Sequence, residues 1–303
     1  MITLAGALVG FVVGLTGMGG GALLTPILVL FLGIDPLTAV SSDLVAAMVM
    51  KPVGGAVHMR RGTVNYGLVG WLMLGSIPAA FGAVIVLTRF ADQAAVSSII
   101  KTAIGVALLF ASAALIVKGA LAARRQASDA NAVIKVKPIA TLLIGVFGGT
   151  VVGLTSVGSG SLMIVFLMLI YPRLSTRALV GTDLVQAVPL VGSAAVAHLL
   201  FGHVQLGITG SLLVGALPAV YLGARISSKA RDGLIRPVLA VVLIASGLKL
   251  LAVPNEVVAI TLLAVATALF VVLRFGSRAA SRIEAVVADA AAEPAIERES
   301  RAS

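Results

Sequence analysis

Two glycine-rich stretches with hydroxyl side chains are the part of this chain best suited to bind a ligand. Residues 14–21 read Gly-Leu-Thr-Gly-Met-Gly-Gly-Gly, and residues 153–160 read Gly-Leu-Thr-Ser-Val-Gly-Ser-Gly. Each lies between two apolar runs, and a helix that begins there presents unpaired N–H groups and a partial positive charge of about half a unit. Because such an end stabilises anions and glycine lets a ligand approach the backbone, we expect the two stretches to form an anion site.

The predicted anion-binding residues are the hydroxyl and glycine residues of both stretches together with one lysine. They are Thr16, Gly17, Gly19, Gly20, Gly21, Lys51, Thr155, Ser156, Gly158, Ser159 and Gly160. Lys51 lies well inside a predicted helix, where its side chain could pair with an anion or extend to the membrane surface. The alternative for the glycines is that they only allow helices to pack closely.

Two aspartates recur at matching positions, each after a hydroxyl residue, as Ser42-Asp43 and Thr182-Asp183. Each lies about seven residues into a predicted helix, roughly 10 Å below its start. Carboxylates inside membrane helices are costly, and they are therefore candidates for function. We expect these four residues and Gln186 to gate the site or to couple it to protons. A structural role, such as a hydrogen bond to the neighbouring turn, is the alternative.

The sequence does not indicate a catalytic centre, a metal site or a cofactor. It has no cysteine, which excludes disulfides and thiolate metal sites. We find no His, Asp and Glu cluster at metal-ligand spacing and no nucleophile paired with a base. The run from Gly17 to Ala22 fits a loose dinucleotide fingerprint, but that fingerprint requires a preceding strand in a soluble βαβ unit.

The composition is that of a polytopic membrane protein. Of the 303 residues, 59% are hydrophobic and only 11% are charged, and the mean hydropathy is +1.13. A soluble domain is about a quarter charged. The net charge of +10 does not predict a nucleic-acid partner, because the Lys and Arg residues lie in short connectors.

We expect Arg60 and Arg61 to contact lipid headgroups, and His58 and His198 to pack near opposite surfaces.

A tandem duplication relates the two halves of the chain. At an offset of 139 residues, which becomes 140 after Tyr171, residues 14–16 match 153–155, and Asp43-Leu44-Val45 matches residues 183–185. We therefore predict an all-α membrane protein with two repeats. The predicted parts are a first repeat at 1–118, a basic cytoplasmic linker at 119–137, a second repeat at 138–251, one extra transmembrane helix at 252–275 and a cytoplasmic tail at 276–303.

Each repeat is expected to hold a re-entrant hairpin of short helices followed by three transmembrane helices. The short runs suggest this, because 12 to 14 residues form a helix of about 20 Å against a hydrocarbon core of about 30 Å. In the first repeat these are hairpin 2–33 and helices 37–58, 66–87 and 96–117. In the second they are hairpin 139–171 and helices 176–199, 206–225 and 231–250, and the extra helix is the apolar run 256–274.

The charges of the connectors predict that the two repeats are inverted relative to each other. Each repeat crosses the membrane an odd number of times, so the second must start on the opposite side from the first. Placing residues 119–137 in the cytoplasm puts most connector Lys and Arg residues there, as the positive-inside rule requires. The N-terminus is then outside and the C-terminus inside. Inverted repeats with interrupted helices are typical of secondary transporters, which bind substrate where the repeats meet.

The glycine run, extended to Gly-Leu-Thr-Gly-Met-Gly-Gly-Gly-Ala-Leu-Leu-Thr-Pro at 14–26, resembles the N-terminal signature of the TauE/SafE sulfite exporter family. This family is also called the toluene-sulfonate uptake permease family. Residues 39–43, 61–64 and 153–155 are similar to it too, and the resemblance covers nearly the whole chain apart from the linker and tail. In the second stretch Ser156 and Ser159 replace glycines and Val165 replaces Pro26; these departures bear on which anion is carried.

The resemblance implies transport of small sulfur-containing or organic anions, such as sulfite, sulfoacetate or sulfonates, across the bacterial cytoplasmic (inner) membrane. We therefore predict a secondary transporter, and not an enzyme, that exports its anion by alternating access, with protons as a candidate coupling ion. Uptake also fits the sequence. Two other functions stay open: a membrane-embedded enzyme acting on a lipid phosphate, and an anion channel. The enzyme would need an acid, base or nucleophile near the glycine stretches, and neither stretch contains an acidic residue.

Overall fold

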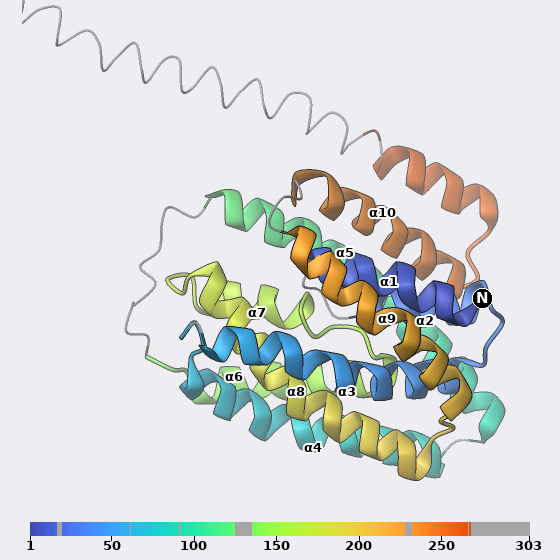
Figure 1. Ribbon diagram of the computed structural model, residues 1–303, viewed down its shortest axis with the longest axis horizontal. Coiled ribbons are helices and arrows are strands. Elements are labelled where there is room, and N and C mark those ends of the chain that lie inside the picture. The colour runs from blue at the N-terminus through green and yellow to red at the C-terminus, as the bar shows by residue number, and fades with distance from the viewer. Residues whose placement is uncertain are drawn as a thin grey trace, which may run out of the picture. The chain divides into compact units, whose positions relative to one another are not determined.

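The computed structural model of the chain describes residues 1–16, 20–60, 62–90, 92–124, 135–227, 232–265 and 267. These residues form α-helices joined by short connectors, with no strand among them (Figure 1), so the predicted all-α class is confirmed. The chain divides into two compact units, residues 1–254 and 255–303. The second unit is described only for a helix at 255–265 and for residue 267.

The helices of the first unit follow the predicted apolar runs closely. Those before the linker are α1 (Ile2–Thr16), α2 (Gly21–Leu30), α3 (Pro36–Arg60), α4 (Tyr66–Phe90) and α5 (Gln93–Arg124). Those after it are α6 (Pro138–Thr155), α7 (Leu162–Ile170), α8 (Thr176–Phe201), α9 (Leu206–Ser227) and α10 (Asp232–Leu250). The largest difference is at the end of α5, which continues through residues 119–124 into the predicted linker. Alanine, leucine and arginine dominate that stretch, and all three are strong helix formers.

Within the described part of the chain, five helices are long and apolar enough to cross a membrane. They are Tyr66–Phe90, Ala94–Gly119, Pro138–Thr155, Arg177–Phe201 and Leu206–Gly223. The predicted span 37–58 lies within α3, which has 25 residues. The 18 residues of α6 span about 27 Å, which is longer than the helix of about 20 Å expected in a re-entrant hairpin. The chain is therefore a multi-pass membrane protein, while the re-entrant hairpins stay a prediction.

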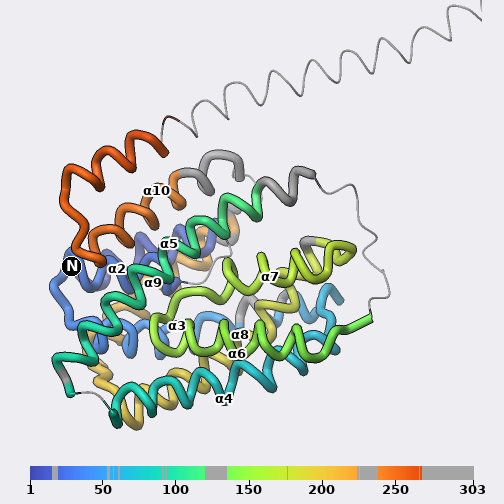
Figure 2. The backbone as a smooth tube through the Cα atoms, turned by 180° about the vertical axis from the view of Figure 1, so that it is seen from behind, coloured from blue at the N-terminus to red at the C-terminus, as the bar shows by residue number. Residues whose placement is uncertain are grey.

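The first helix of each half packs on the fourth helix of the other half. Helix α1 contacts α9, and α6 contacts α4 (Figure 2). A Cβ atom on Gly10 would lie 2.7 Å from the Cα of Ala216, and one on Gly149 would lie 2.6 Å from the Cα of Ser76. Only glycine permits such close approach, so both contacts use the packing that small residues allow. Gly10 and Gly149 are also counterparts in the duplication, so one contact occurs twice with the halves exchanged.

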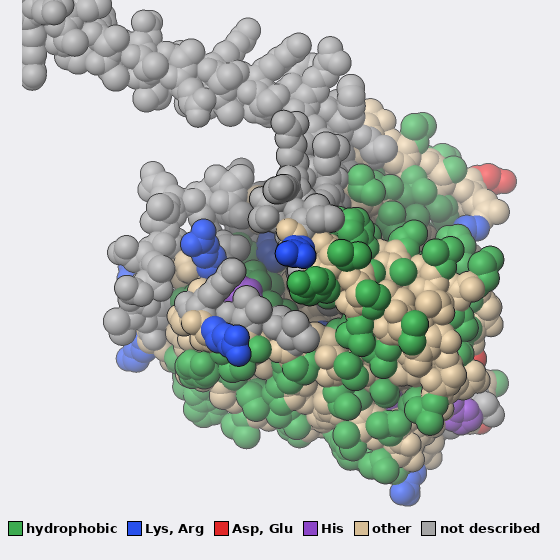
Figure 3. All heavy atoms as spheres, viewed as in Figure 1, with side chains coloured by type: hydrophobic (Ala, Val, Ile, Leu, Met, Phe, Trp, Pro, Cys, Tyr) green, Lys and Arg blue, Asp and Glu red, His purple; other side chains and the backbone are tan. Residues whose placement is uncertain are grey.

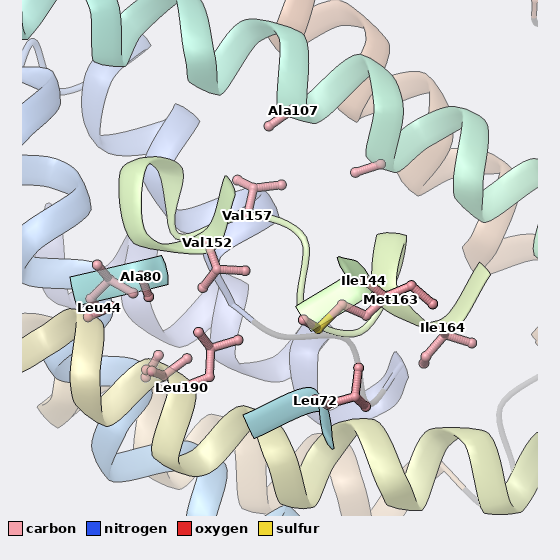
Figure 4. Close-up of a cluster of buried hydrophobic side chains, with 14 of the residues drawn as sticks. Leu44, Leu72, Ala80, Ala107, Ile144, Val152, Val157, Met163, Ile164 and Leu190 are labelled. Atoms are coloured by element: carbon pink, nitrogen blue, oxygen red, sulfur yellow. The ribbon is translucent and has the colours of Figure 1, made fainter. Parts of the chain in front are cut away.

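The turn between α6 and α7 lies inside the first unit. Val157 in this turn is fully buried, as are Val152 in α6 and Met163 in α7. Figure 4 shows these side chains in a hydrophobic cluster with residues of α3, α4, α5 and α8, among them Leu44, Ala80, Ala107 and Leu190. The surrounding helices therefore hold the turn from several sides.

Much of the molecular surface is hydrophobic. Figure 3 shows apolar side chains over much of the visible face, whereas most of its Lys and Arg side chains lie toward one end. Exposed examples in α6, α8 and α9 are Leu143, Leu200 and Val214. A surface of this kind is suited to contact with lipid chains rather than water.

Candidate functional site

The start of α2 touches the second glycine-rich stretch in the interior of the first unit. A Cβ atom on Gly21, the first residue of α2, would overlap the backbone carbonyl oxygen of Ser156 and lie 2.7 Å from its hydroxyl oxygen. Gly20 and Gly21 are buried, and so is every residue from 156 to 161. The start of α2 therefore lies directly against the end of α6.

The second turn is stabilised by its own hydroxyl and glycine residues. The hydroxyl of Thr155 donates a hydrogen bond to the carbonyl oxygen of Val151 at 2.6 Å and accepts one from the N–H of Val157 at 3.1 Å. Gly158 and Gly160 adopt φ angles of 124° and 97°, which side chains other than glycine rarely tolerate. Thr155, predicted to bind the anion, thus uses its hydroxyl to shape the turn.

Helix α3 places Asp43 beside the start of α2. The side chain is fully buried, and its Oδ2 accepts a hydrogen bond of 2.8 Å from the hydroxyl of Thr25 in α2. Its Oδ1 lies 3.9 Å from the position of a Cβ on Gly20 and makes no hydrogen bond, although the hydroxyl of Ser156 is nearby. Because the beginning of a helix carries partial positive charge, the carboxylate occupies a position that stabilises anions.

Helix α8 places Asp183 beside the start of α7 in the same manner. Its side chain is 1% exposed, and Oδ1 accepts a hydrogen bond of 3.1 Å from the amide of Gln186. The carboxylate also lies close to the backbone N–H of Gly160, two residues before α7 begins. Its Oδ2 has no hydrogen-bond partner. The two aspartates thus lie at equivalent ends of the two short helices.

Lys51 of α3 lies near both carboxylates. Its ammonium group donates a hydrogen bond to the hydroxyl of Ser159 in the second turn, and the side chain is half-buried. It is close enough to Asp43 and to Asp183 to interact electrostatically with each. With both carboxylates ionised, two negative charges and one positive charge leave this cluster with one excess negative charge.

Gln186 fixes Asp183 within a network that joins three helices. The side chain is fully buried, and besides Asp183 its Nε2 lies 2.8 Å from the sulfur of Met163 in α7. Its Oε1 accepts a hydrogen bond of 3.3 Å from the hydroxyl of Ser76 in α4. Since both ends of the amide are occupied, the orientation of Gln186 and of the carboxylate it holds is well defined.

Other predicted site residues lie elsewhere or outside the described residues. The hydroxyl of Thr182 accepts a hydrogen bond of 3.0 Å from the N–H of Asn65, so it contacts the connector between α3 and α4. The hydroxyl of Ser42 is buried without a partner. Gly17, Gly19 and the side chain of Thr16 are not among the described parts of the chain.

His198 links three helices rather than packing near a surface. It is 1% exposed, its Nδ1 lies 2.7 Å from the hydroxyl oxygen of Ser41 in α3, and its Nε2 lies 2.8 Å from the carbonyl oxygen of Gly153 in α6. A carbonyl oxygen can only accept, so Nε2 carries a proton. Its counterpart His58 contacts the hydroxyl of Thr63 at 3.0 Å, beside the connector after α3.

Three residues of the site were not predicted, namely Thr25, Ser76 and Met163. Their counterparts in the other repeat are Ile164, Ala216 and Leu24, so the duplication did not mark them as polar pairs. Thr25 lies within the run at 14–26 that carries the family resemblance. Its place in that run, as a hydroxyl residue in an apolar helix, could have identified it as a candidate site residue.

A hollow of about 520 Å³ lies near this site but is chemically different from it. It runs between α5 and α6–α7, and its lining is mostly apolar, with Phe110 and Phe147 among its residues. Thr155 lines it, whereas Asp43, Lys51 and Asp183 do not. The charged cluster, and not this hollow, is therefore the candidate site for an anion.

Comparisons with known proteins identify one family and two relatives named as membrane transporters. The family described as "Sulfite exporter TauE/SafE" matches residues 2–250. The "Probable membrane transporter protein YjnA" of Bacillus subtilis (strain 168) is 38% identical over 252 residues, which are 82% of this chain and 98% of that protein. The "Probable membrane transporter protein YdhB" of the same organism is 28% identical over 233 residues, 75% of this chain and 90% of that protein. No solved structure matches the chain.

Proposed function

This chain belongs to the sulfite exporter TauE/SafE family of membrane transporters, and we propose that it exports a small sulfur-containing or organic anion. The substrate class is that of sulfite, sulfoacetate and sulfonates, and transport proceeds by alternating access across the bacterial cytoplasmic membrane. The chain is a transporter rather than an enzyme, in agreement with the names of its relatives.

One observation carries this proposal: the start of α2 and the buried turn before α7 meet near a lysine. The sulfonate or sulfite oxygens accept hydrogen bonds from the backbone N–H groups at the starts of α2 and α7, from the hydroxyls of Ser156 and Ser159, and from Lys51. Charge-assisted bonds of this kind are short and strong. Helix N-termini supply partial positive charge without placing more ionised side chains in the membrane.

The architecture we propose is a pair of inverted repeats with re-entrant hairpins. The exchange of partners between α1·α9 and α6·α4 supports it. So does the arrangement in Figures 1 and 2, where α1 begins at the end of the bundle marked N and α6 begins at the opposite end. The gathering of Lys and Arg side chains toward one end supports an orientation with the N-terminus outside and the C-terminus in the cytoplasm (Figure 3).

Asp43 and Asp183 couple this site to protons in the proposal. Both are buried in helices of a membrane protein, where ionisable residues mark transport pathways and proton relays. Each contacts the start of a short helix that would rearrange as the site opens to one side or the other. Gln186 maintains Asp183 in place during this change.

The test is anion flux in proteoliposomes. Purified protein is reconstituted, and release of sulfite, sulfoacetate and methanesulfonate is followed with and without a pH gradient, against protein-free liposomes. We expect saturable flux for at least one of these compounds, and faster exchange when the same anion is present on both sides. Lack of flux for all three would overturn the substrate class, and flux that does not saturate would indicate a channel instead.

A further inference from the structure

We infer that Asp43 and Asp183 are tethered competitors of the transported anion, and that the anion binds together with a proton. The carboxylates occupy the anion-stabilising ends of α2 and α7 while the site is empty. A substrate anion can use these ends only after a carboxylate has taken up a proton from water. This inference rests on the proposed function and adds to it which groups the anion must displace.

The position of the carboxylates is the first observation that supports competition. Asp43 lies beside Gly20 and Thr25 at the start of α2, and Asp183 lies beside Gly160 before the start of α7. Both short helices begin at the turns that meet in the interior. The same placement occurs twice although the two turns differ in sequence. An anion that binds to these turns therefore meets a carboxylate at each helix end.

The unpartnered oxygens are the second observation. Oδ1 of Asp43 and Oδ2 of Asp183 are buried and make no hydrogen bond. A buried, ionised oxygen without a partner is unfavourable, whereas a protonated carboxyl group can donate its hydrogen. The hydroxyl of Ser156 is close to Asp43, and a hydroxyl can donate to the ionised carboxylate or accept from the protonated carboxyl group. Both carboxylates thus have one oxygen free to receive a proton.

The charges around the cluster make proton uptake necessary for tight anion binding. Asp43 faces Lys51 and the hydroxyls of Thr25 and Ser156. Asp183 faces Lys51, Lys118 and the amide of Gln186. With both carboxylates ionised, Asp43, Asp183 and Lys51, the three charged groups that interact with one another, together carry one excess negative charge. An added monoanion would double that charge, whereas one proton on a carboxylate keeps it unchanged.

The experiment is equilibrium binding of radiolabelled methanesulfonate, a sulfonate with a single negative charge, to the purified protein between about pH 6 and pH 8, where this compound stays fully ionised. One proton per anion predicts that the affinity of the wild-type protein falls by up to about tenfold for each unit of rising pH. Asp43→Asn and Asp183→Asn remove a competitor, and we expect each to bind more tightly than wild type at the upper pH and with a weaker pH dependence. Asp92→Asn, an exposed residue before α5, is the matched control and should behave as wild type.

The result that overturns the inference is wild-type binding that does not change with pH, or aspartate variants that bind no more tightly than wild type at the upper pH. If the variants fail to fold, calorimetry of wild-type binding in two buffers of different ionisation enthalpy decides the question. We expect about one proton taken up per anion bound. Binding without proton uptake refutes the inference while leaving the proposed function intact, and absence of any anion binding refutes both.

Discussion

Substitution of Gly21 by alanine tests whether the contact between the two turns is required. The added methyl group would overlap the carbonyl oxygen of Ser156 and lie 2.7 Å from both the carbonyl carbon and the hydroxyl oxygen. Two of these atoms belong to the backbone of a buried turn, which cannot move aside as a flexible side chain can. We therefore expect Gly21→Ala to separate α2 from the second turn.

Overpacking of a buried contact costs about 1–3 kcal/mol. Since about 1.4 kcal/mol corresponds to a factor of ten, the arrangement in which the turns touch should become roughly 5-fold to 150-fold less favoured. If the anion binds only to that arrangement, its apparent affinity should fall by a similar factor. The same cost should lower the thermal midpoint of the purified protein in detergent.

The adjacent residue offers a matched control. A Cβ atom on Gly20 would have only ordinary contacts, the nearest at 3.6 Å from Leu24 and 3.7 Å from Met50, and Gly20 has a φ of −58° that alanine adopts readily. Thermal unfolding of Gly20→Ala and Gly21→Ala is measured side by side in detergent, because this readout does not depend on whether the anion touches Gly20. Equal behaviour of the two variants would refute the contact between the turns as the basis of the site.

Three further predictions follow from the same geometry. Thr25→Val removes the hydrogen-bond donor of Asp43 and should destabilise the protein by about 1–3 kcal/mol in thermal or denaturant unfolding, because a buried acceptor is left unpaired; an unchanged midpoint would contradict this. Gln186→Leu removes the hydrogen bonds that Gln186 makes with Asp183 and Ser76, and it should slow proteoliposome flux because Asp183 is no longer held in place. Normal flux would contradict a positioning role for Gln186. In this cysteine-free chain, single cysteines at exposed Arg60 and His203 should react with a membrane-impermeant maleimide from opposite sides of the membrane, and labelling from the same side would exclude inverted repeats.

The helices were largely predictable from the sequence, because apolar runs set the positions of α1 to α10. The pairing of α1 with α9 and of α6 with α4 was not predicted, since the sequence pattern does not show which helices of the two halves meet. The extension of α5 beyond residue 118 was missed because basic residues nearby suggested a linker. Helix propensity in residues 119–124 outweighed that signal.

The site was predictable only in part, because its residues meet through packing between the two halves. Asp43 and Asp183 recur in the duplication, so their equivalence could be predicted. The hydrogen bond from Lys51 to Ser159 joins residues 108 positions apart, and Val191 is the counterpart of Lys51, so no repeat pattern indicates it. Thr182 repeats the position of Ser42, yet its hydroxyl contacts the connector at Asn65. Which face of a helix meets which turn depends on how the two halves pack, and a local pattern does not contain that information.

The most direct test of the central claim is binding of radiolabelled sulfite to wild-type protein and to Lys51→Met in parallel. Methionine keeps most of the apolar stem and removes the charge that contacts Ser159 and lies near Asp43 and Asp183. A lost charge-assisted hydrogen bond is worth about 1.5–3 kcal/mol, so the affinity of the variant should fall by roughly 10-fold to 150-fold. Equal affinity of the two proteins would show that the anion does not bind between the turns beside Lys51.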